Sequence, residues 1–344
     1  MATVREIAEK CGVSVGTVDR VLHNRGRVNE KTRQRILDTA KVLDYKPNRV
    51  AQGLAVRKKR LRIAFFAIEA QSHPFFADVN AAARKKAAEL ADFAVEVVFI
   101  RVSLSINALG EFRPCVFMPD SISLADFDGF ITPGTMQYEN FAPLPKEKPI
   151  VYYNDIGDGE CLAYVGSNYE KAGRIAAELC ALSADEHKEI AILDEDNGDT
   201  SSPSFRKRMK GFFESMKSEH SDFNILNTYH FQNDYSIEFE RTKAFLKAYP
   251  NVSVAYVVNP GNYDICRAIH DADVEKKIRI ITNDLGEAQK MLMRTGAISA
   301  AITQEPDAQG AKSLDILFEY LAYGRTPEKI HFTDLGIHVF GNSD

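Results

Sequence analysis

The sequence lacks the signatures of the common nucleotide-dependent and metal-dependent enzymes. Its 344 residues contain neither a Gly-x-Gly-x-x-Gly run nor a Gly-x-x-x-x-Gly-Lys-Ser/Thr run, so the loops that cradle phosphates in such proteins are missing. The eight histidines are scattered and form no His-Glu-x-x-His motif. The carboxylates of an acidic turn at 194–199 are not spaced as in a calcium loop, because the glycine and the distal glutamate that such a loop needs are not at the required positions. We therefore expect no catalytic residues, no metal and no cofactor.

Cysteine is scarce, and long apolar runs are absent. The five cysteines are odd in number and form no Cys-x-x-Cys pair, which predicts small core residues in a reducing compartment. No apolar run is long enough to cross a bilayer, and Met1 leads into a capped helix rather than into a signal peptide. The sequence therefore predicts a cytoplasmic protein with no membrane partner.

Charge of opposite sign separates the first sixty residues from the rest. Residues 1–60 carry fifteen Lys or Arg and six Asp or Glu, a net charge of +9, whereas residues 61–344 carry a net charge of −14. A phosphate backbone attracts the first part and repels the second. The basic segment is thus predicted to bind a polyanion, and the acidic body is predicted to serve another purpose.

The basic segment has the pattern of three short helices. Thr3 and Glu6 form a capping box, and Gly12 suits the left-handed end of the first helix. Ser14 is the expected N-cap of a second helix over 15–23, and Asn29 that of a third. The inner faces are predicted to hold Val4, Ile7, Ala8, Cys11, Val18, Val21, Leu22, Ile36, Leu37, Ala40 and Leu43. This arrangement is a helix-turn-helix, whose second helix enters the major groove of DNA.

Residues 3–54 resemble, without a gap, the N-terminal signature of the LacI/GalR (lac repressor) family of bacterial transcriptional regulators. The resemblance rests on Thr3-Val4-Arg5-Glu6-Ile7-Ala8, Gly12-Val13-Ser14, Thr17-Val18, Arg20-Val21-Leu22, Thr32-Arg33 and Tyr45-Lys46-Pro47-Asn48. One position departs from the family, because Asp19 stands where members usually have Ser. A carboxylate near the phosphate backbone is unfavourable unless an arginine neutralises it.

The resemblance implies which residues contact DNA. Val15 and Gly16 fall on the two specificity positions of the recognition helix, where readout would rely on shape or on thymine methyl groups. Arg20 matches the base-reading arginine of the family, which suits guanine. Phosphate contacts at helix N-termini are implied for Ser14, Thr17, Asn29 and Thr32. The plainer alternative is that Ser14 and Asn29 are only N-caps and that Arg20 is a solvated surface arginine.

Residues 48–60 resemble the hinge helix of the same family. Pro47 prevents a helix from running through from the third helix, and a helix of about eight residues is not stable alone in water. The resemblance implies that this segment pairs with its dimer mate in the minor groove. Leu54 would be the apolar wedge that opens a base step, with Ala51 at the helix–helix contact and Asn48 at the start. A simple linker is the alternative.

From residue 61 onward, apolar strand-like runs alternate with amphipathic helices. Strands are predicted at 62–68, 95–100, 129–132, 150–153, 190–193, 254–258, 279–282 and 297–302. Such alternation predicts parallel sheets covered on both faces, and the length of the region predicts two lobes. The region resembles the type I periplasmic sugar-binding fold that occurs in this family. The predicted fold class is therefore an N-terminal all-α helix-turn-helix domain plus an α/β core of two doubly wound parallel-sheet lobes.

The predicted domain organisation follows from these segments. The helix-turn-helix domain covers 1–47, the hinge helix and basic linker cover 48–60, and the effector-binding domain covers 61–344. The first lobe is expected at about 61–165 and 306–333, and the second lobe at about 166–305 and 334–344. Ligands in such sheets bind beyond the C-terminal ends of the strands, in the cleft between the lobes.

Polar and aromatic residues follow these strands and form the candidate ligand set. They are Gln71, Phe75, Phe76, Arg206, Arg208, Asn259, Asp284 and Gln304. The resemblance implies that the phenylalanines form a platform for a sugar ring and that an arginine of an Arg-x-Arg-x-x-Gly-Phe run reaches the ligand hydroxyls. Arg208 is the first choice for that arginine and Arg206 the second. The set suits a neutral, polyhydroxylated ligand, although each residue alone could be an ordinary loop residue.

Together these features predict a homodimeric, sequence-specific transcriptional regulator of the repressor type, with operator DNA and a small carbohydrate effector as partners. Two half-sites and a paired hinge require two copies of the chain. Two other classes of protein stay open. One is a sugar-processing enzyme with a DNA-binding appendage, and the other is a DNA-binding protein with a vestigial cleft.

Overall fold

The structure is a computed structural model. It describes residues 3–22, 28–43, 45, 57–69, 75–106, 112–119, 121–134, 143–156, 159–195, 203–226, 229–231, 234–258, 263–275 and 277–343. Within these ranges, no helix is both long and apolar enough to span a membrane. The same part of the chain brings no three His, Cys, Asp or Glu side chains together in a metal-binding cluster.

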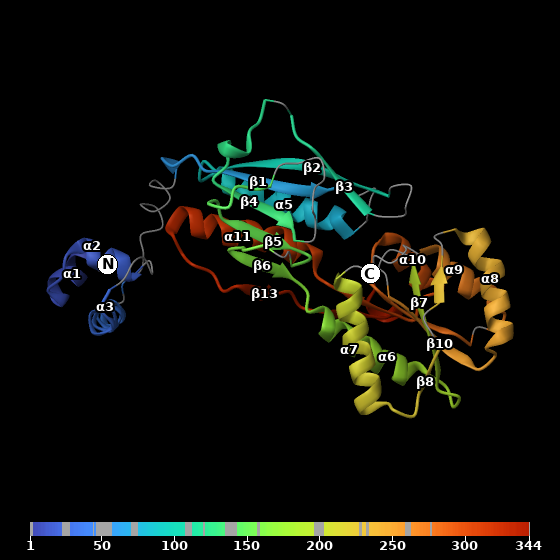
Figure 1. The fold of residues 1–344 in the computed structure, drawn as a ribbon. Helices are drawn as coiled ribbons and strands as arrows, with labels where there is room; N and C mark the ends of the chain where they lie inside the picture. The colour runs from blue at the N-terminus through green and yellow to red at the C-terminus, as the bar shows by residue number, and fades with distance from the viewer. Residues whose placement is uncertain are drawn as a thin grey trace.

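Three helices form the N-terminal domain: α1 (Val4–Cys11), α2 (Val15–Leu22) and α3 (Glu30–Val42) (Figure 1). The capping box of α1 is confirmed, since the amide of Glu6 donates to Thr3 Oγ1 at 3.2 Å and the amide of Thr3 donates to Glu6 Oε2 at 2.9 Å. Gly12 ends α1 with φ 59°, in the left-handed region that favours glycine.

The inner faces of the three helices form one small core. Its buried members are Ile7, Ala8, Cys11, Val18, Val21, Ile36 and Ala40. One predicted core residue is wrong, because Leu37 is 38% exposed. Successive helical residues lie about 100° apart around the axis, and Ile36 with Ala40 already forms the stripe that faces α1 and α2. Leu37 therefore lies beside that stripe.

A seven-stranded sheet forms the first lobe. Its strands are β1 (Arg62–Ile68), β2 (Glu96–Ile106), β3 (Phe112–Phe117), β4 (Gly129–Pro133), β5 (Ile150–Tyr153), β6 (Ala163–Gly166) and β13 (Ile330–Phe332). Their order is β13-β6-β5-β4-β1-β2-β3. Every neighbouring pair is parallel except β2 and β3. The helices α5 (Phe75–Ala91) and α11 (Pro306–Tyr323) pack in this lobe, with a short turn η1 (Leu124–Asp126).

A second seven-stranded sheet forms the second lobe. Its strands are β7 (Glu189–Glu195), β8 (Asn224–Ile225), β9 (Tyr229–Phe231), β10 (Val252–Val257), β11 (Arg279–Asn283), β12 (Ala300–Thr303) and β14 (Gly336–His338). The order is β14-β12-β11-β10-β7-β8, and β9 also pairs with β7. The helices are α6 (Tyr169–Ser183), α7 (Pro203–Glu219), α8 (Tyr235–Ala248), α9 (Tyr263–Ala272) and α10 (Glu287–Arg294), followed near the end by η2 (Phe340–Asn342).

Both faces of this second sheet are covered, because alternate residues of each strand point to opposite sides. On β10, Val254 and Tyr256 join the core under α6 and α7, whereas Ala255 and Val257 join the core under α9 and α10. Figure 1 shows these two groups of helices on either side of the strands. Such doubly covered parallel strands read as continuous apolar runs, which is why the sequence revealed them.

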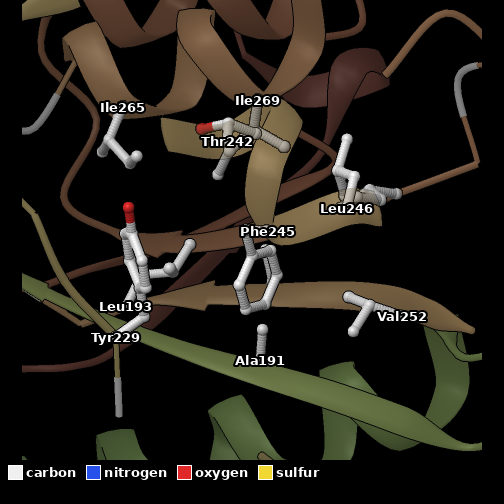
Figure 2. Close-up of a pocket in the computed structure, with 11 residues that line it drawn as sticks. Ala191, Leu193, Tyr229, Thr242, Phe245, Leu246, Val252, Ile265 and Ile269 are labelled. Carbon is white, nitrogen blue, oxygen red and sulfur yellow. The ribbon is translucent and has the colours of Figure 1, made fainter. Parts of the chain in front are cut away.

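The core between the second sheet and the helices α8 and α9 contains a small cavity (Figure 2). Its volume is about 10 Å³, roughly the room of one water molecule. The side chains around it are Ala191, Leu193, Tyr229, Thr242, Phe245, Leu246, Val252, Ala255, Ile265, Ile269 and Ile278. Because the lining is almost entirely apolar and the space is so small, this cavity is a packing gap and not a ligand site.

The chain passes between the two sheets three times. The crossovers are residues 167–168 between β6 and α6, residues 304–305 between β12 and α11, and residues 333–335 between β13 and β14. Buried side chains bind them together: the Thr333 hydroxyl donates to the main-chain oxygen of Gln304 at 2.9 Å and lies 3.1 Å from the Ser167 hydroxyl. The predicted fold class, a helix-turn-helix domain plus two doubly wound lobes, is confirmed.

Candidate DNA-binding and ligand-binding sites

The helix α2 presents its predicted base-reading residues to solvent. Val15, Gly16 and Arg20 are all exposed, while Val18 and Val21 hold the opposite side of the helix against the core. Arg20 Nε donates to the main-chain oxygen of Gly16 at 3.1 Å, so the arginine lies along the helix, over the turn that precedes it. The three predicted residues therefore share one accessible surface near the start of α2.

The predicted phosphate-binding residues lie at two helix N-termini. Ser14 Oγ accepts from the amide of Thr17 at 3.2 Å and lies 2.9 Å from the Thr17 hydroxyl. Asn29 Oδ1 accepts from the amide of Lys31 at 3.0 Å. Ser14 and Asn29 are exposed, whereas Thr17 and Thr32 are half-buried. Both capping residues thus act as N-caps, and their exposure at helix N-termini leaves the predicted phosphate contacts geometrically open.

Asp19, the residue that departs from the family pattern, lies near Tyr45. Burial, and then the negative charge of Asp19, raise the pKa of the Tyr45 hydroxyl. The carboxyl group is half-buried, so it is not among the exposed residues at the start of α2. No local pattern predicts this neighbour, because Tyr45 follows α3 and is separated from Asp19 by the whole third helix.

Five predicted site residues lie outside the residues that the structure describes. They are Asn48, Ala51 and Leu54 of the hinge segment, and Gln71 and Asn259 of the ligand set. Their roles stay predictions.

The two predicted platform residues, Phe75 and Phe76, begin α5 and are buried. Their rings pack edge to face with centroids 5.2 Å apart, and Phe76 also packs edge to face on Tyr153 at 6.2 Å. All three belong to the core of the first lobe. Most of each ring therefore contacts protein, and stacking of a sugar on them remains a prediction.

Arg208 and Arg206 lie on different sides of α7. Arg208 is only 2% exposed, whereas Arg206 is exposed. The Arg208 guanidinium carbon lies 4.8 Å from the centre of the Tyr169 ring, the distance of a cation–π contact. Residues two apart in a helix point about 200° away from each other, so only one of the two arginines can face the interior. The structure thus places the first-choice arginine inside.

Two glycines bring α6 and α7 close enough for this contact. A Cβ on Gly173 of α6 would overlap the main-chain oxygen of Arg208, and a Cβ on Gly211 of α7 would overlap the main-chain oxygen of Glu170. Only glycine permits such an approach of one helix backbone to another. The glycine of the Arg-x-Arg-x-x-Gly-Phe run is therefore required for the position of Arg208 on Tyr169.

Asp284 and Gln304 meet at the C-terminal ends of the neighbouring parallel strands β11 and β12. Gln304 Nε2 donates to Asp284 Oδ1 at 2.6 Å, and both side chains are buried. The preceding residue, Asn283, fastens the strand ends, since its Nδ2 donates to the main-chain oxygen of Val258 at 2.8 Å and to the Tyr256 hydroxyl at 3.2 Å. The structure therefore brings two of the predicted ligand residues into direct contact.

The electrostatics around Tyr169 link these residues to the first lobe. The pKa of the Tyr169 hydroxyl is raised well above its ordinary value, first by burial and then by the negative charge of Asp155. Arg208 acts in the opposite direction and lowers the pKa, while Asp284 raises it. Two carboxyl groups that follow β5 of the first lobe and β11 of the second lobe, and the guanidinium of Arg208 on α7, thus act on one phenol.

Sequence reasoning missed Asp155, Tyr164 and Tyr169, all of which are buried at this place. Asp155 comes just after the predicted strand 150–153, so the strand-end rule that selected Asp284 could have found it. No comparable signal marks the tyrosines. Tyr164 lies within a short strand, and Tyr169 looks like an apolar residue of a helix.

Arg208 Nε and Gln304 Oε1 are among the buried polar atoms at this place that have no hydrogen-bond partner among the described residues. Buried polar atoms are nearly always bonded, and an unsatisfied one costs about 1–3 kcal/mol. One is a donor and the other an acceptor, which are the two groups that a hydroxyl can satisfy. With the carboxylates of Asp155 and Asp284, the site is equipped to hydrogen-bond a polyhydroxylated molecule.

Comparison with known families gives two matches. A family model described as "Bacterial regulatory proteins, lacI family" matches residues 3–48, and one described as "Periplasmic binding protein domain" matches residues 146–326. Among curated proteins, the "Probable HTH-type transcriptional repressor ExuR" of Bacillus subtilis (strain 168) is 26% identical over 333 residues, which cover 93% of this chain and 92% of the relative. The "Ribose operon repressor" of the same strain is 46% identical over 61 residues, 18% of this chain and 19% of that protein.

Solved structures share the fold of the two lobes. A putative LacI transcriptional regulator from Bacteroides fragilis matches with a TM-score of 0.68 and 22% identity, over 82% of this chain and 98% of that structure. GanP, a glucose-galactose binding protein from Geobacillus stearothermophilus, matches with a TM-score of 0.62 and 18% identity, again over 82% and 98%. At these identities the likeness concerns the fold alone.

Proposed function

This chain belongs to the lacI family of bacterial regulatory proteins, and from that membership we propose that it is a repressor whose operator affinity is set by a small carbohydrate ligand. Relatives named as transcriptional repressors match both the helix-turn-helix part and nearly the whole chain. The helix-turn-helix supplies the DNA-reading surface, and the lobes supply the ligand site. The protein acts as a regulator, not as an enzyme.

The observation that carries the ligand half of the proposal is the meeting of Arg208, Asp284 and Gln304 beside the crossovers. Arg208 contacts the Tyr169 ring, the charge of Asp284 acts on the same phenol, and Gln304 is hydrogen-bonded to Asp284. A buried guanidinium, a carboxylate and an amide at strand ends match the donors and acceptors that sugar hydroxyls need. Because Gln304 is itself a crossover residue, a ligand bound there acts on the junction of the lobes.

Two copies of the chain form the working unit in this proposal. The α2 helices of a homodimer enter successive major grooves, and the paired 48–60 segments lie in the minor groove with Leu54 as the wedge. In this proposal, residues 1–47 read the DNA, residues 48–60 form the hinge, and residues 61–344 bind the effector. The three crossovers separate the two lobes of the last part. The protein works in the cytoplasm, where operator DNA is found.

The test has a DNA half and a ligand half. The DNA half is selection of bound sequences from a random duplex library, which should enrich a two-fold symmetric site with half-sites about one or more helical turns apart. The ligand half is thermal unfolding with D-glucose, D-galactose, D-ribose and D-arabinose. A ligand at about 100 times its dissociation constant adds about 2.7 kcal/mol to stability.

Each failure has its own meaning. Chemical conversion of a stabilising sugar would indicate a sugar-processing enzyme with a DNA-binding appendage. A selected operator whose affinity no stabilising sugar alters would indicate a vestigial cleft. A library that yields no enriched sequence would contradict the DNA half of the proposal.

A further inference from the structure

Tyr169 belongs to the second lobe by its helix and is bonded to the first lobe by its hydroxyl. It is the first residue of α6, directly after the crossover 167–168, and is only 3% exposed. Its hydroxyl lies 2.9 Å from the main-chain oxygen of Asn154 and 3.0 Å from Asn154 Oδ1. Asn154 follows β5, and its main-chain amide donates to the main-chain oxygen of Val165 in β6 at 3.1 Å. The phenol therefore fastens α6 to the first sheet.

The acceptor of this bond is held rigidly. Asn154 has φ 63°, in the left-handed region that Asn tolerates better than most residues, and this conformation directs its carbonyl group. A second phenol, that of Tyr164, donates to the same oxygen at 2.7 Å and lies 3.3 Å from the main-chain oxygen of Ser167. Tyr164 is part of β6, so its bond to Asn154 stays within the first lobe.

The ring of Tyr169 contacts the guanidinium of Arg208. It lies 4.8 Å from the centre of the Tyr169 ring, and the contact of Gly173 with the Arg208 backbone fixes α7 one turn along α6. With 2% of Arg208 exposed, a shift of the guanidinium must also displace the ring that covers it. Ring and guanidinium thus form one packed unit, whose far end is bonded to the first lobe.

We propose that Tyr169 is a positioning residue that couples the guanidinium of Arg208 to the orientation of the two lobes. The proposal rests on the proposed function in one respect, that Arg208 contacts the effector. The Tyr169 ring holds the guanidinium, and the Tyr169 hydroxyl resists rotation of α6 against Asn154. A ligand that hydrogen-bonds to the guanidinium changes the strength of the hydrogen bond between Tyr169 and Asn154. It thereby favours one lobe orientation over the other.

The first experiment compares Tyr169→Phe with Tyr164→Phe by hydrogen–deuterium exchange in the full chain, with neither DNA nor sugar added. Both variants keep the ring and lose one hydrogen bond to Asn154, but only the first bond crosses between the lobes. We expect Tyr169→Phe to raise exchange in peptides over 150–156 and 169–175 by roughly fivefold, the effect of one lost hydrogen bond. Tyr164→Phe should raise it over 150–156 only.

Two results would overturn the inference at this stage. One is wild-type exchange over 169–175 in Tyr169→Phe. The other is a Tyr164→Phe variant that loosens α6 as much as Tyr169→Phe does, since that would show a general structural effect of losing a buried phenol bond.

The second experiment tests the coupling itself by a double-mutant cycle. Arg208→Ala should raise exchange over 150–156, although Arg208 is in the other lobe. In the Tyr169→Phe background the same substitution should add nothing, because the connection is already broken. Additive effects would overturn the proposal. Because no ligand is used, additive effects in this cycle would leave the proposed function intact. Absence of any sugar response would contradict the proposed function and would leave the result of the cycle unchanged.

Discussion

Gln304 holds Asp284 with its side chain and the lobe junction with its backbone. Its Nε2 donates to Asp284 Oδ1 at 2.6 Å, while its main-chain oxygen accepts from the Thr333 hydroxyl at 2.9 Å and from Gln309 Nε2 at 3.1 Å. One residue thus takes part in the candidate ligand site and in a crossover between the sheets. A change at Asp284 therefore has a short route to the crossovers through buried side chains.

The first prediction concerns Arg208 and Asp284. Arg208→Ala and Asp284→Asn should each weaken the binding of a stabilising sugar by about 1.5–3 kcal/mol, because hydrogen bonds to charged groups are lost from a buried site. Asn is chosen at 284 because the residue has φ 62°, which Ala tolerates poorly, and because Asn keeps an acceptor for Gln304. Operator affinity without sugar should stay near the wild-type value. The measurement is calorimetric titration of sugar and operator titration for each variant.

Arg206→Ala is the matched control for that experiment. It removes the same charge from the same helix, two residues away, where the side chain is exposed. Sugar affinity should change little. If Arg206→Ala lost the sugar and Arg208→Ala kept it, the second-choice arginine would be the ligand contact and the order of the two assignments would be reversed.

Much of the fold followed from the sequence because its elements carry local signals. The strands at 62–68 and 150–153 have the predicted bounds, since each is a continuous apolar run buried on both faces. The predicted strand 95–100 extends to Ile106, where it pairs with the antiparallel strand β3. The pairing of β2 with β3 depends on residues distant along the chain, so no local sequence pattern predicts it. The predicted strand 297–302 begins only at Ala300, after a turn through Gly296 with φ 82°.

The candidate site was predicted in part for the same reason. Arg208, Asp284 and Gln304 were found from motif and strand-end position, and the structure brings them to one place. Tyr169 was missed because its role depends on a contact with Asn154 across a crossover. A residue that acts by joining two sheets has no signature within its own helix.

The second prediction concerns the glycines between α6 and α7. Gly173→Ala and Gly211→Ala each place a methyl group against a main-chain oxygen of the other helix, so the helices must separate. Overpacking of this kind costs about 1–3 kcal/mol of unfolding free energy. Gly341→Ala is the control, because nothing lies within 4 Å of its added methyl group. Urea unfolding followed by circular dichroism would measure all three, and equal stability of the three variants would contradict the close approach.

The third prediction concerns Arg20. Arg20→Ala should weaken binding to the selected operator by about 1–3 kcal/mol and relax the base preference at one position of each half-site. Lys41→Ala removes the same charge from an exposed place in the last turn of α3 and should affect operator and random DNA alike. Titration of both variants on both duplexes at one salt concentration is the measurement. Equal losses for Arg20→Ala on operator and random DNA would make it a phosphate contact and not a base contact.

The fourth prediction concerns the stability of the second lobe at alkaline pH. Burial raises the pKa of Tyr256 to about 12, against an ordinary value of 10.0. Between these values the unfolded chain loses the phenol proton while the folded chain keeps it, so stability is complete below pH 10 and falls as the pH rises. The loss approaches about 2.7 kcal/mol above pH 12, and about half of it is present at pH 11.

Tyr256→Phe removes that loss while keeping the ring, which stacks on Phe212 with centroids 5.2 Å apart. The variant should be less stable than wild type at pH 8, by about 1 kcal/mol, because the hydrogen bond from Asn283 Nδ2 is gone. From pH 8 to pH 11, however, wild type should lose about 1.4 kcal/mol more unfolding free energy than the variant. The reason is that pH 11 lies one unit above the pKa of the phenol in the unfolded chain, and one pKa unit corresponds to about 1.4 kcal/mol. Urea unfolding at the two pH values measures both quantities. Equal losses in the two proteins would mean that Tyr256 ionises as readily in the folded chain as in the unfolded one, and that the core beneath α6 and α7 admits water.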